Sequence, residues 1–419
     1  MNNGFVKVAA ATPKIKVGDC GYNGAQICKI IDEVYDNGAQ LVVFPELCIT
    51  GYTCSDLFWQ KSMLDMAKTH LQFIAEHCED KEIVAIVGLP MIYRSKLYNV
   101  AAVIYDGEIL GLVPKTYIPN YSEFYEARHF TSGKDGYVMI GEEEVPFGTE
   151  ILFNCVNFEN FSFAIEICED LWVPNPPSTS HALAGATVIA NLSASDETTG
   201  KDIYRTGLVS GQSARTLSAY IYADAGEGES TTDLVFAGHN IIAENGNILS
   251  QSKRFENQTI YADIDLDRLA AERAKMTTFI PDEELSYEEV EVELEPIDFE
   301  VERVIDNAPF VPSNTNEREK RCEEILSIQT MGLKKRLEHT NCKNAVVGIS
   351  GGLDSTLALL VTARAFDKLN LDRKGIIAVT MPGFGTTDRT YTNAVSMIEK
   401  LGCTFKEVNI SEATVLHMN

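Results

Sequence analysis

Short apolar runs alternate with amphipathic stretches from Phe5 to about Ile264. Apolar runs bounded by turn residues predict strands, and apolar positions three and four residues apart predict helices. The helical pattern covers Gly21–Asn37 and Leu64–Cys78. The predicted strands are Val6–Ala11, Leu41–Phe44, Ile83–Leu89, Val100–Tyr105, Phe161–Ile167, Thr187–Ala190, Ala219–Ala223 and Ile241–Ala243.

Some neighbouring strands are separated by helical stretches, and others only by a tight turn. "YDGEIL" (Tyr105–Leu110) and "ENGNIL" (Glu244–Leu249) are typical of hairpins. Because helical crossovers join parallel strands and tight turns join antiparallel ones, this mixture predicts an α/β sandwich with both kinds of pairing.

A second α/β unit follows a proline-containing stretch, "PFVPSNTNEREKR" (Pro309–Arg321). Its predicted elements are helix Glu317–Leu337, strand Asn344–Ile349, helix Asp354–Leu369, strand Gly375–Thr380 and helix Thr390–Leu401. Two strands without closing partners, in a span of about 100 residues, indicate an incomplete doubly wound domain.

Composition is that of a soluble globular protein, with 45% apolar and 23% charged residues among 419. This length suggests two or three domains. The sequence contains no run of about 18 apolar residues that would predict a membrane span. The N-terminus lacks a basic start followed by an apolar stretch, so we expect a cytoplasmic protein.

The formal charge of −26 argues against a broad nucleic-acid surface. Ten of the acids lie in Pro281–Val301, which has no Lys or Arg and is typical of a solvated segment. The ten cysteines are scattered without a Cys-x-x-Cys pair or zinc spacing, so neither a structural metal site nor disulfides are expected.

Three segments each place a reactive side chain just after a predicted strand or a proline. "LVVFPELCITGY" carries Glu46, "GLVPKTYIPNYSEFYEARHF" carries Lys115 and "FAIEICEDLWVPNPP" carries Cys168. Taken singly, each residue is also typical of an ordinary structural position. Together they supply a thiol nucleophile, a carboxylate base for its proton, and an ammonium for the oxyanion formed on an amide carbon.

In this order and with these flanks, the segments resemble the nitrilase superfamily, whose triad is Glu, Lys, Cys. "FPEL", "PKTYIPNY" and "CEDLW" fit its glutamine amidohydrolase branch. The resemblance implies an α-β-β-α sandwich and glutamine contacts at Tyr121, Ser195 and Lys201, where some relatives carry Arg at the last position. Glu126 and Glu169 are further candidates; either one could instead be a supporting hydrogen-bond partner of Lys115 or of a backbone amide.

A glycine-rich turn, "VVGISGGLDSTLALL" (Val346–Leu360), lies between an apolar run and a helical pattern. It lacks the Lys of a Walker A loop and has the form S-G-G-x-D-S. Glycines let backbone N–H groups approach phosphate, the helix N-terminus adds positive charge, and a carboxylate can hold Mg²⁺. An ordinary capped helix start is the alternative. The predicted ATP contacts are Gly348, Ile349, Ser350, Gly351, Gly352, Leu353, Asp354 and Ser355, with Asp354 as the Mg²⁺ ligand.

This turn resembles the pyrophosphate loop (PP-loop) of the ATP-pyrophosphatases, and "IIAVTMPGFGTTDRTYTNA" resembles their NAD synthetase members. With the upstream amidohydrolase, the whole chain is similar to the glutamine-dependent NAD synthetases. These ligases use ammonia from glutamine, passed inside the protein, to amidate ATP-activated deamido-NAD. The resemblance implies ATP with Mg²⁺, no tightly bound organic cofactor, and a homo-oligomer. The charge and the lack of a long apolar run predict neither nucleic-acid nor membrane partners.

By this reading, residues 1–274 form the amidohydrolase domain, 275–316 an acidic linker, and 317–419 the N-terminal part of a Rossmann-like synthetase domain. Synthetase domains of the family continue beyond "SEATVLHMN", so we expect this chain to retain the glutaminase half only.

Three rival functions remain open. A stand-alone amidase would hydrolyse glutamine without responding to ATP or deamido-NAD. A tRNA-modifying relative is disfavoured by the charge and by "MPGFGTTDRT". A non-catalytic nucleotide sensor would not be labelled at Cys168 by a reactive glutamine analogue.

Overall fold

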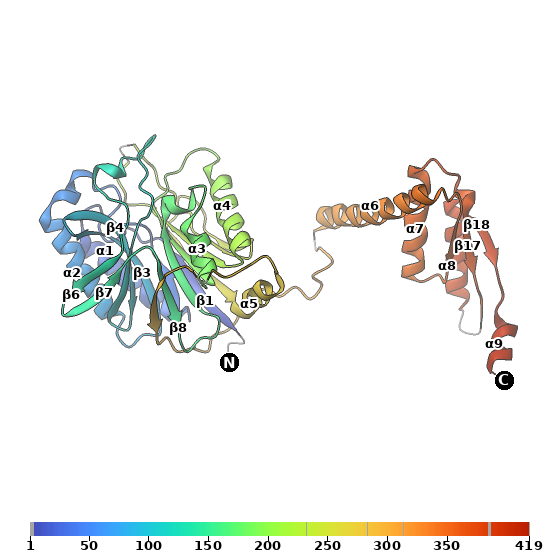
Figure 1. The fold of residues 1–419 in the computed structure, drawn as a ribbon, viewed down its shortest axis with the longest axis horizontal. Helices are drawn as coiled ribbons and strands as arrows, with labels where there is room; N and C mark the ends of the chain where they lie inside the picture. The colour runs from blue at the N-terminus through green and yellow to red at the C-terminus, as the bar shows by residue number, and fades with distance from the viewer. Residues whose placement is uncertain (1–3, 232, 283, 313, 384–386, 419) are drawn as a thin grey trace. The chain divides into compact units, whose positions relative to one another are not determined.

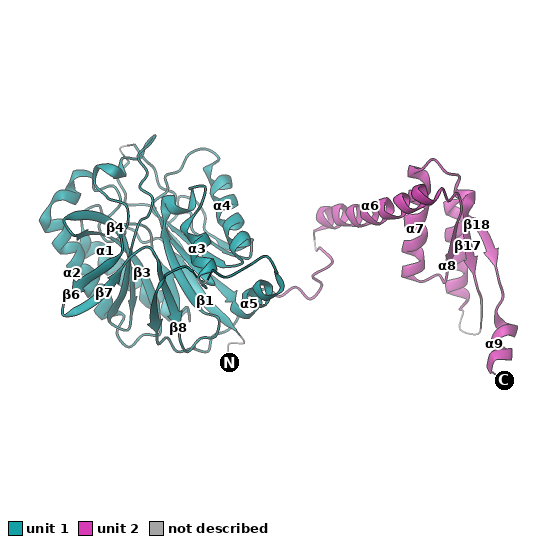
Figure 2. Ribbon diagram, in the orientation of Figure 1, with its two compact units in different colours: residues 1–304 teal, residues 305–419 magenta. Residues whose placement is uncertain are grey.

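Figure 1 shows the fold of the computed structural model, which describes residues 4–231, 233–282, 284–312, 314–383 and 387–418. The chain forms two compact units, residues 1–304 and 305–419, which Figure 2 shows in different colours. We call them unit 1 and unit 2.

Unit 1 contains two mixed sheets. The first has eight strands in the order β14 (Thr259–Asp265), β1 (Phe5–Ala11), β2 (Leu41–Val43), β3 (Val84–Tyr93), β4 (Lys96–Tyr105), β5 (Glu108–Pro114), β7 (Glu143–Phe147), β6 (Gly136–Ile140). The second has seven strands in the order β13 (Asn247–Gln251), β12 (Ile241–Glu244), β11 (Ala219–Asp224), β10 (Val188–Ser193), β9 (Ser162–Ile167), β8 (Ile151–Cys155), β15 (Glu288–Val292).

The two sheets pack face to face through alternate residues of their strands, because successive side chains of a strand point to opposite faces. Val8 of β1 shares one buried cluster with Ile165 and Ile221 of the second sheet. Its neighbour Ala9 belongs to a different cluster, between the first sheet and its covering helices. The core between the sheets is therefore built from every second residue of the strands.

Helices cover both outer faces of this pair of sheets, as Figure 1 shows. α1 (Cys20–Asp36) and α2 (Lys61–His77) pack on the first sheet through residues such as Ile27 and Leu71. α3 (Pro177–Leu183) and α4 (Lys201–Thr216) cover the second sheet, where Val209 packs on Tyr220. The predicted α-β-β-α sandwich is confirmed. α5 (Leu266–Lys275) follows β14.

The pairings match the sequence pattern. β1, β2 and β3 are parallel, as are β9, β10 and β11, and the intervening chain contains the covering helices. The two tight turns join antiparallel hairpins, β4–β5 and β12–β13. The carboxyl ends of β2, β9 and β10 lead into the segments that carry Glu46, Cys168 and Ser195, respectively.

The expectation that residues 275–316 form an acidic linker is wrong in part. Its strand β15 pairs in parallel with β8, with Glu288 opposite Ile151. Val292 and Leu294 are fully buried in the core between the sheets. The alternation in "EVEVEL" explains the pairing, because the acids point outward while the apolar side chains at every second position point inward.

Polar contacts hold the chain to unit 1 as far as Arg303. Arg303 forms a two-point ion pair with the buried Glu244 at 2.6 and 2.7 Å. Asp263 accepts the backbone N–H groups of Glu302 and Arg303. The connection between the units is therefore shorter than the sequence pattern predicted.

Unit 2 is a three-stranded parallel sheet with helices. Its elements are α6 (Thr315–Thr340), β16 (Ala345–Gly348), α7 (Leu353–Lys368), β17 (Ile376–Thr380), α8 (Asp388–Leu401), β18 (Thr404–Glu407) and α9 (Ser411–Met418). Phe366 of α7, Ala378 of β17 and Ile398 of α8 form its core. The expectation of only two strands was wrong, because the short, polar β18 pairs with β17. Within the described residues, no helix is long and apolar enough to cross a membrane.

Candidate active site and nucleotide loop

A buried ammonium between two carboxylates lies at the centre of the candidate site. Lys115 follows β5, is fully buried, and donates to Glu46 Oε1 at 2.7 Å. It also donates to both oxygens of Glu126, at 2.7 and 2.9 Å. Glu46, just after β2, further accepts from Asn99 Nδ2 at 2.6 Å and from the backbone N–H of Ala194 at 3.0 Å. This hydrogen bonding fixes Glu46 and Lys115 relative to each other.

Cys168 begins the turn that follows β9. Its φ of +44° is in the left-handed region, which non-glycine residues rarely adopt and which is often found at functional sites. Its N–H donates to Asn191 Oδ1 on β10 at 3.2 Å, and the residue is buried. The structure brings its thiol into the electrostatic environment of Glu46 and Lys115.

The charges in this cluster shift each other's pKa values. Burial raises the pKa of the Cys168 thiol well above its usual value, Glu46 raises it further, and Lys115 lowers it. Burial works to lower the pKa of Lys115, but the charges of Glu126 and Glu46 outweigh it and raise that pKa. Burial raises the pKa of Glu126 to about 7 although Lys115 opposes the shift. The resting thiol is therefore neutral, and attack requires a base to remove its proton.

Asp170 joins the cysteine turn to the lysine loop. One of its oxygens accepts the N–H of Ile167 at 2.9 Å, and the other accepts the N–H of Tyr117 at 2.8 Å. The side chain is buried. Since Ile167 and Tyr117 lie within two residues of Cys168 and Lys115, this side chain links the segments that carry those two residues.

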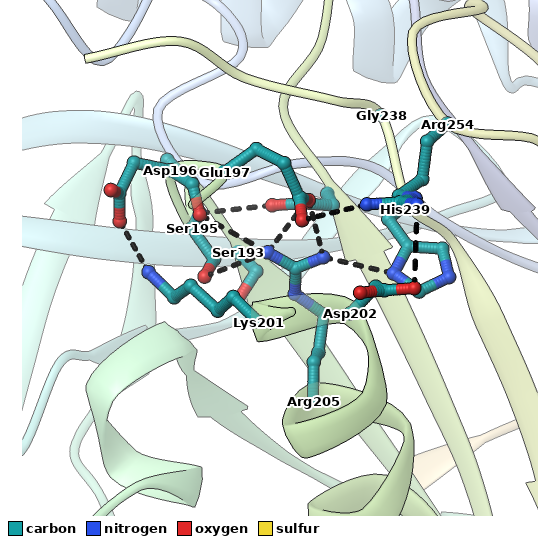
Figure 3. A network of polar contacts seen from close by, with 12 residues as sticks. Ser193, Ser195, Asp196, Glu197, Lys201, Asp202, Arg205, Gly238, His239 and Arg254 are labelled. Atoms are coloured by element: carbon teal, nitrogen blue, oxygen red, sulfur yellow. Dashed lines mark hydrogen bonds and ion pairs between the residues drawn. The ribbon is translucent and has the colours of Figure 1, made fainter. Parts of the chain in front are cut away.

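The residues expected to contact glutamine lie around the same place. Tyr121 donates to both oxygens of Glu169, at 2.9 and 3.0 Å, which ties it to the residue next to Cys168. Lys201 forms an ion pair with Asp196, and its ammonium lies 5.3 Å from the ring centroid of Trp172 and 5.6 Å from that of Phe124. Ser195 is buried and accepts from Arg205 at 3.3 Å. Figure 3 shows Ser195, Lys201 and Arg205 in one polar network.

Several residues of this site carry no local sequence motif. Asn99, Asn191 and Arg205 lie outside the quoted motifs and outside the predicted elements, and Asp170 lies within "CEDLW" but was given no role. Only their partners across the fold reveal a role. Of the two additional candidates, Glu126 hydrogen-bonds Lys115 and Glu169 hydrogen-bonds Tyr121.

The glycine turn of unit 2 connects β16 to α7. Gly351 has a φ of +82°, and a Cβ there would lie 2.2 Å from the carbonyl oxygen of Thr390. No side chain caps the α7 N-terminus, where Gly352 is the N-cap residue. Ser350 Oγ and Ser355 Oγ lie 3.2 Å apart beside it. The backbone N–H groups of the first turn are thus available to an anion.

The other predicted contacts of the turn are placed differently. Ile349 is buried, with its N–H on the carbonyl of Val379. Leu353 and Asp354 are exposed. In the described part of the chain, no group of three or more His, Cys, Asp or Glu is arranged to hold a metal ion. Phe384, Gly385 and Thr386 of the downstream motif lie outside the described residues.

Comparisons with known proteins find a family match in each of the two units. The carbon-nitrogen hydrolase family model matches residues 7–274, and the NAD synthase model matches 325–418. The glutamine-dependent NAD(+) synthetase of Mycobacterium tuberculosis (H37Rv) is 41% identical over 100% of this chain and 63% of its own length. That of Aquifex aeolicus is 29% identical over 99% of this chain and 67% of its own. The chain thus spans less than two thirds of the mycobacterial relative.

Solved structures share the fold. A glutamine-dependent NAD(+) synthetase from Cytophaga hutchinsonii has a TM-score of 0.56 at 24% identity, covering 99% of this chain and 66% of that one. Saccharomyces cerevisiae Nit3, of the nitrilase superfamily, has a TM-score of 0.52 at 18% identity, covering 66% of this chain and 95% of that one. With the family match extending over most of unit 1, the chain belongs to the carbon-nitrogen hydrolase family.

Proposed function

We propose that unit 1 hydrolyses the side-chain amide of L-glutamine and that the whole protein uses the ammonia to convert deamido-NAD to NAD⁺. One observation carries the first half: a buried Lys115 ammonium lies between Glu46 and Glu126, and the buried Cys168 thiol lies within the influence of their charges. Such a group can attack an amide and stabilise the resulting oxyanion without exposure to bulk water.

The reaction begins as Glu46 removes the thiol proton and the sulfur bonds to the amide carbon. Lys115 stabilises the oxyanion. The carbon–nitrogen bond then breaks, and ammonia leaves with the proton that Glu46 carried, so that a thioester remains on Cys168. Water, deprotonated by Glu46, adds to this thioester; glutamate is released and the proton returns to the thiolate.

Tyr121, Ser195 and Lys201 are proposed to bind the α-carboxylate and α-ammonium of glutamine. Lys201 supplies the positive charge, with Asp196 and the rings of Phe124 and Trp172 limiting its movement. A lysine here acts as a point charge where an arginine would bind the carboxylate with two parallel bonds.

Glutamate release from glutamine tests this assignment. Cys168→Ala is expected to lower the turnover at least about 10³-fold, since no other group replaces the nucleophile. Cys155→Ala, which changes another buried cysteine at the end of a strand of the same sheet, serves as the matched control and is expected to retain activity. Turnover that survives Cys168→Ala would contradict the mechanism.

Covalent labelling gives an independent measurement. A glutamine analogue with a diazo-ketone or chloroketone group is expected to label Cys168 alone among ten cysteines. Cys322 and Cys342 are exposed and therefore report nonspecific alkylation. Labelling only at these two would favour a non-catalytic role for unit 1.

For the second half, we propose that the glycine turn binds the phosphates of ATP and that Asp354 holds Mg²⁺. The uncapped α7 N-terminus and the hydroxyls of Ser350 and Ser355 fit phosphate oxygens. An exposed carboxylate fits a cation that takes its remaining ligands from phosphate and water. Bound Mg²⁺ would neutralise phosphate charge. Calorimetry with Mg-ATP tests this proposal: Asp354→Asn is expected to weaken binding, and equal affinity would contradict it.

The acceptor is proposed from the mycobacterial relative's name and the NAD synthase match. Adenylation of the nicotinate carboxylate would release pyrophosphate, and ammonia would then displace AMP. Glutaminase rates with and without ATP and deamido-NAD distinguish this activity from that of a stand-alone amidase, whose rate would not respond. We further propose a homo-oligomer, as the resemblance implies, and a cytoplasmic location, as the sequence pattern predicted.

A further inference from the structure

One buried cation beside the site takes no part in the steps above. Arg205 belongs to α4, one turn after Lys201, and is fully buried. Removing an arginine from water costs several kcal/mol unless its N–H groups are well paired, and apolar substitutes for buried ion pairs are often equally stable. The contacts of this guanidinium therefore indicate what it does.

Arg205 binds three consecutive residues of the loop that leaves β10. Nη1 donates to Glu197 Oε2 at 2.9 Å, and Nη2 donates to the carbonyl oxygen of Asp196 at 3.2 Å and to Ser195 Oγ at 3.3 Å. Figure 3 shows the guanidinium between these residues. Ser195, proposed to contact glutamine, and Asp196, the partner of Lys201, are thus held by one side chain.

Two further groups lie close to the guanidinium, one at hydrogen-bond distance and one as a longer ion pair. His239 Nδ1 accepts from Nη1 at 2.8 Å, and Asp224 Oδ2 lies 4.0 Å from Nη2. Burial first, and then the Arg205 charge, lower the pKa of His239 to about 4, so its ring is neutral and can accept this bond. Asp224 also accepts the Ser195 N–H at 2.9 Å, which fixes the backbone of the serine.

The bond to Ser195 has a chemical consequence. A serine hydroxyl has one hydrogen and two acceptor lone pairs. Because Arg205 donates to the oxygen, the hydroxyl hydrogen is directed to another acceptor. A carboxylate only accepts hydrogen bonds, so a serine held in this way suits the α-carboxylate of an amino acid.

We propose that Arg205 is a positioning residue for substrate recognition: it holds Ser195 as a hydrogen-bond donor to the α-carboxylate of glutamine. This inference rests on the proposed glutaminase function. It predicts that changes at Arg205 act on the binding of α-amino acid amides and leave the thiol chemistry intact.

Steady-state kinetics of Arg205→Lys test the proposal. Lysine keeps the charge but cannot reach several acceptors at once. The KM for glutamine is expected to rise about tenfold, as for loss of one hydrogen bond to a charged group, with kcat within about twofold. Butyramide, which lacks both α-groups, should be hydrolysed by variant and wild type at similar kcat/KM. Arg215→Lys, an exposed change on the same helix, is the matched control.

A double-mutant cycle separates positioning from general destabilisation. If Arg205 acts through Ser195, then Arg205→Lys combined with Ser195→Ala should raise the KM no further than Ser195→Ala alone. Glu197→Gln, which keeps the arginine but weakens its anchor, should raise the KM about threefold. It decides the question if Arg205→Lys does not fold.

An unchanged KM in the folded variants, additive effects in the cycle, or an equal loss of butyramide and glutamine turnover would overturn the proposal. A wild-type chain without glutaminase activity would instead overturn the proposed function on which it rests.

Discussion

Replacing Asp170 by Asn tests whether the tie between the cysteine turn and the lysine loop holds the site together. Asparagine has the same shape but keeps one acceptor oxygen and replaces the other with an NH₂ donor. If the oxygen remains on Tyr117, the NH₂ group faces the N–H of Ile167, which loses its partner at 2.9 Å. Leaving one buried N–H unpaired costs about 1–3 kcal/mol of unfolding free energy.

Chemical denaturation of unit 1 measures this cost, and glutamine turnover measures its effect on the site. We expect kcat to fall because Cys168 and Lys115 are no longer fixed relative to each other. Asp56→Asn is the matched control: Asp56 is exposed, with its ion pair to Arg128 in solvent, and a smaller loss is expected. A stability of Asp170→Asn within about 0.5 kcal/mol of wild type, with kcat unchanged, would refute the reasoning.

Three further changes have defined outcomes. Burial lowers the pKa of His181 to about 4, below its unfolded value of 6.5. As the pH falls from 6.5 to 4, wild type should therefore lose on the order of 3 kcal/mol more stability than His181→Gln. Urea titration measures both losses, and equal losses would contradict this. Burial raises the folded pKa of Glu126 to about 7, above its unfolded value of 4.5. Wild type should therefore lose stability relative to Glu126→Gln as the pH rises from 4.5 through 7. Urea midpoints at pH 5 and 8 measure this loss, and a stability difference between the two proteins that stays constant would count against it. Gly351→Ala should destabilise unit 2 by at least about 1 kcal/mol, because the φ of this residue is positive and a Cβ would meet the Thr390 carbonyl. Gly332→Ala, on the open surface of a helix, should instead stabilise unit 2 by about 0.5–1 kcal/mol. Thermal melts that rank the two variants otherwise would disprove the reasoning.

Local patterns were sufficient where a residue's role depends on its immediate neighbours in the chain. The apolar runs before Glu46 and Cys168 predicted β2 and β9, and thus that both residues follow the carboxyl ends of strands. The two hairpin turns and the helices α1 and α2 were predicted for the same reason. β15 was missed although its alternation is visible, because ten acids in that stretch suggested a solvated segment.

Long-range packing decided the rest. The bond of Asn99 to Glu46 joins residues 53 positions apart, and that of Arg205 to His239 joins residues 34 apart. A polar side chain in a strand or helix carries no mark of the partner it will meet, because the meeting depends on which faces pack together. By itself, the sequence determined the apolar strands and helices with a clear pattern, their alternation and the reactive residue types. Only the tertiary structure decided which polar groups are buried together, since burial removes the water that would otherwise satisfy each one separately.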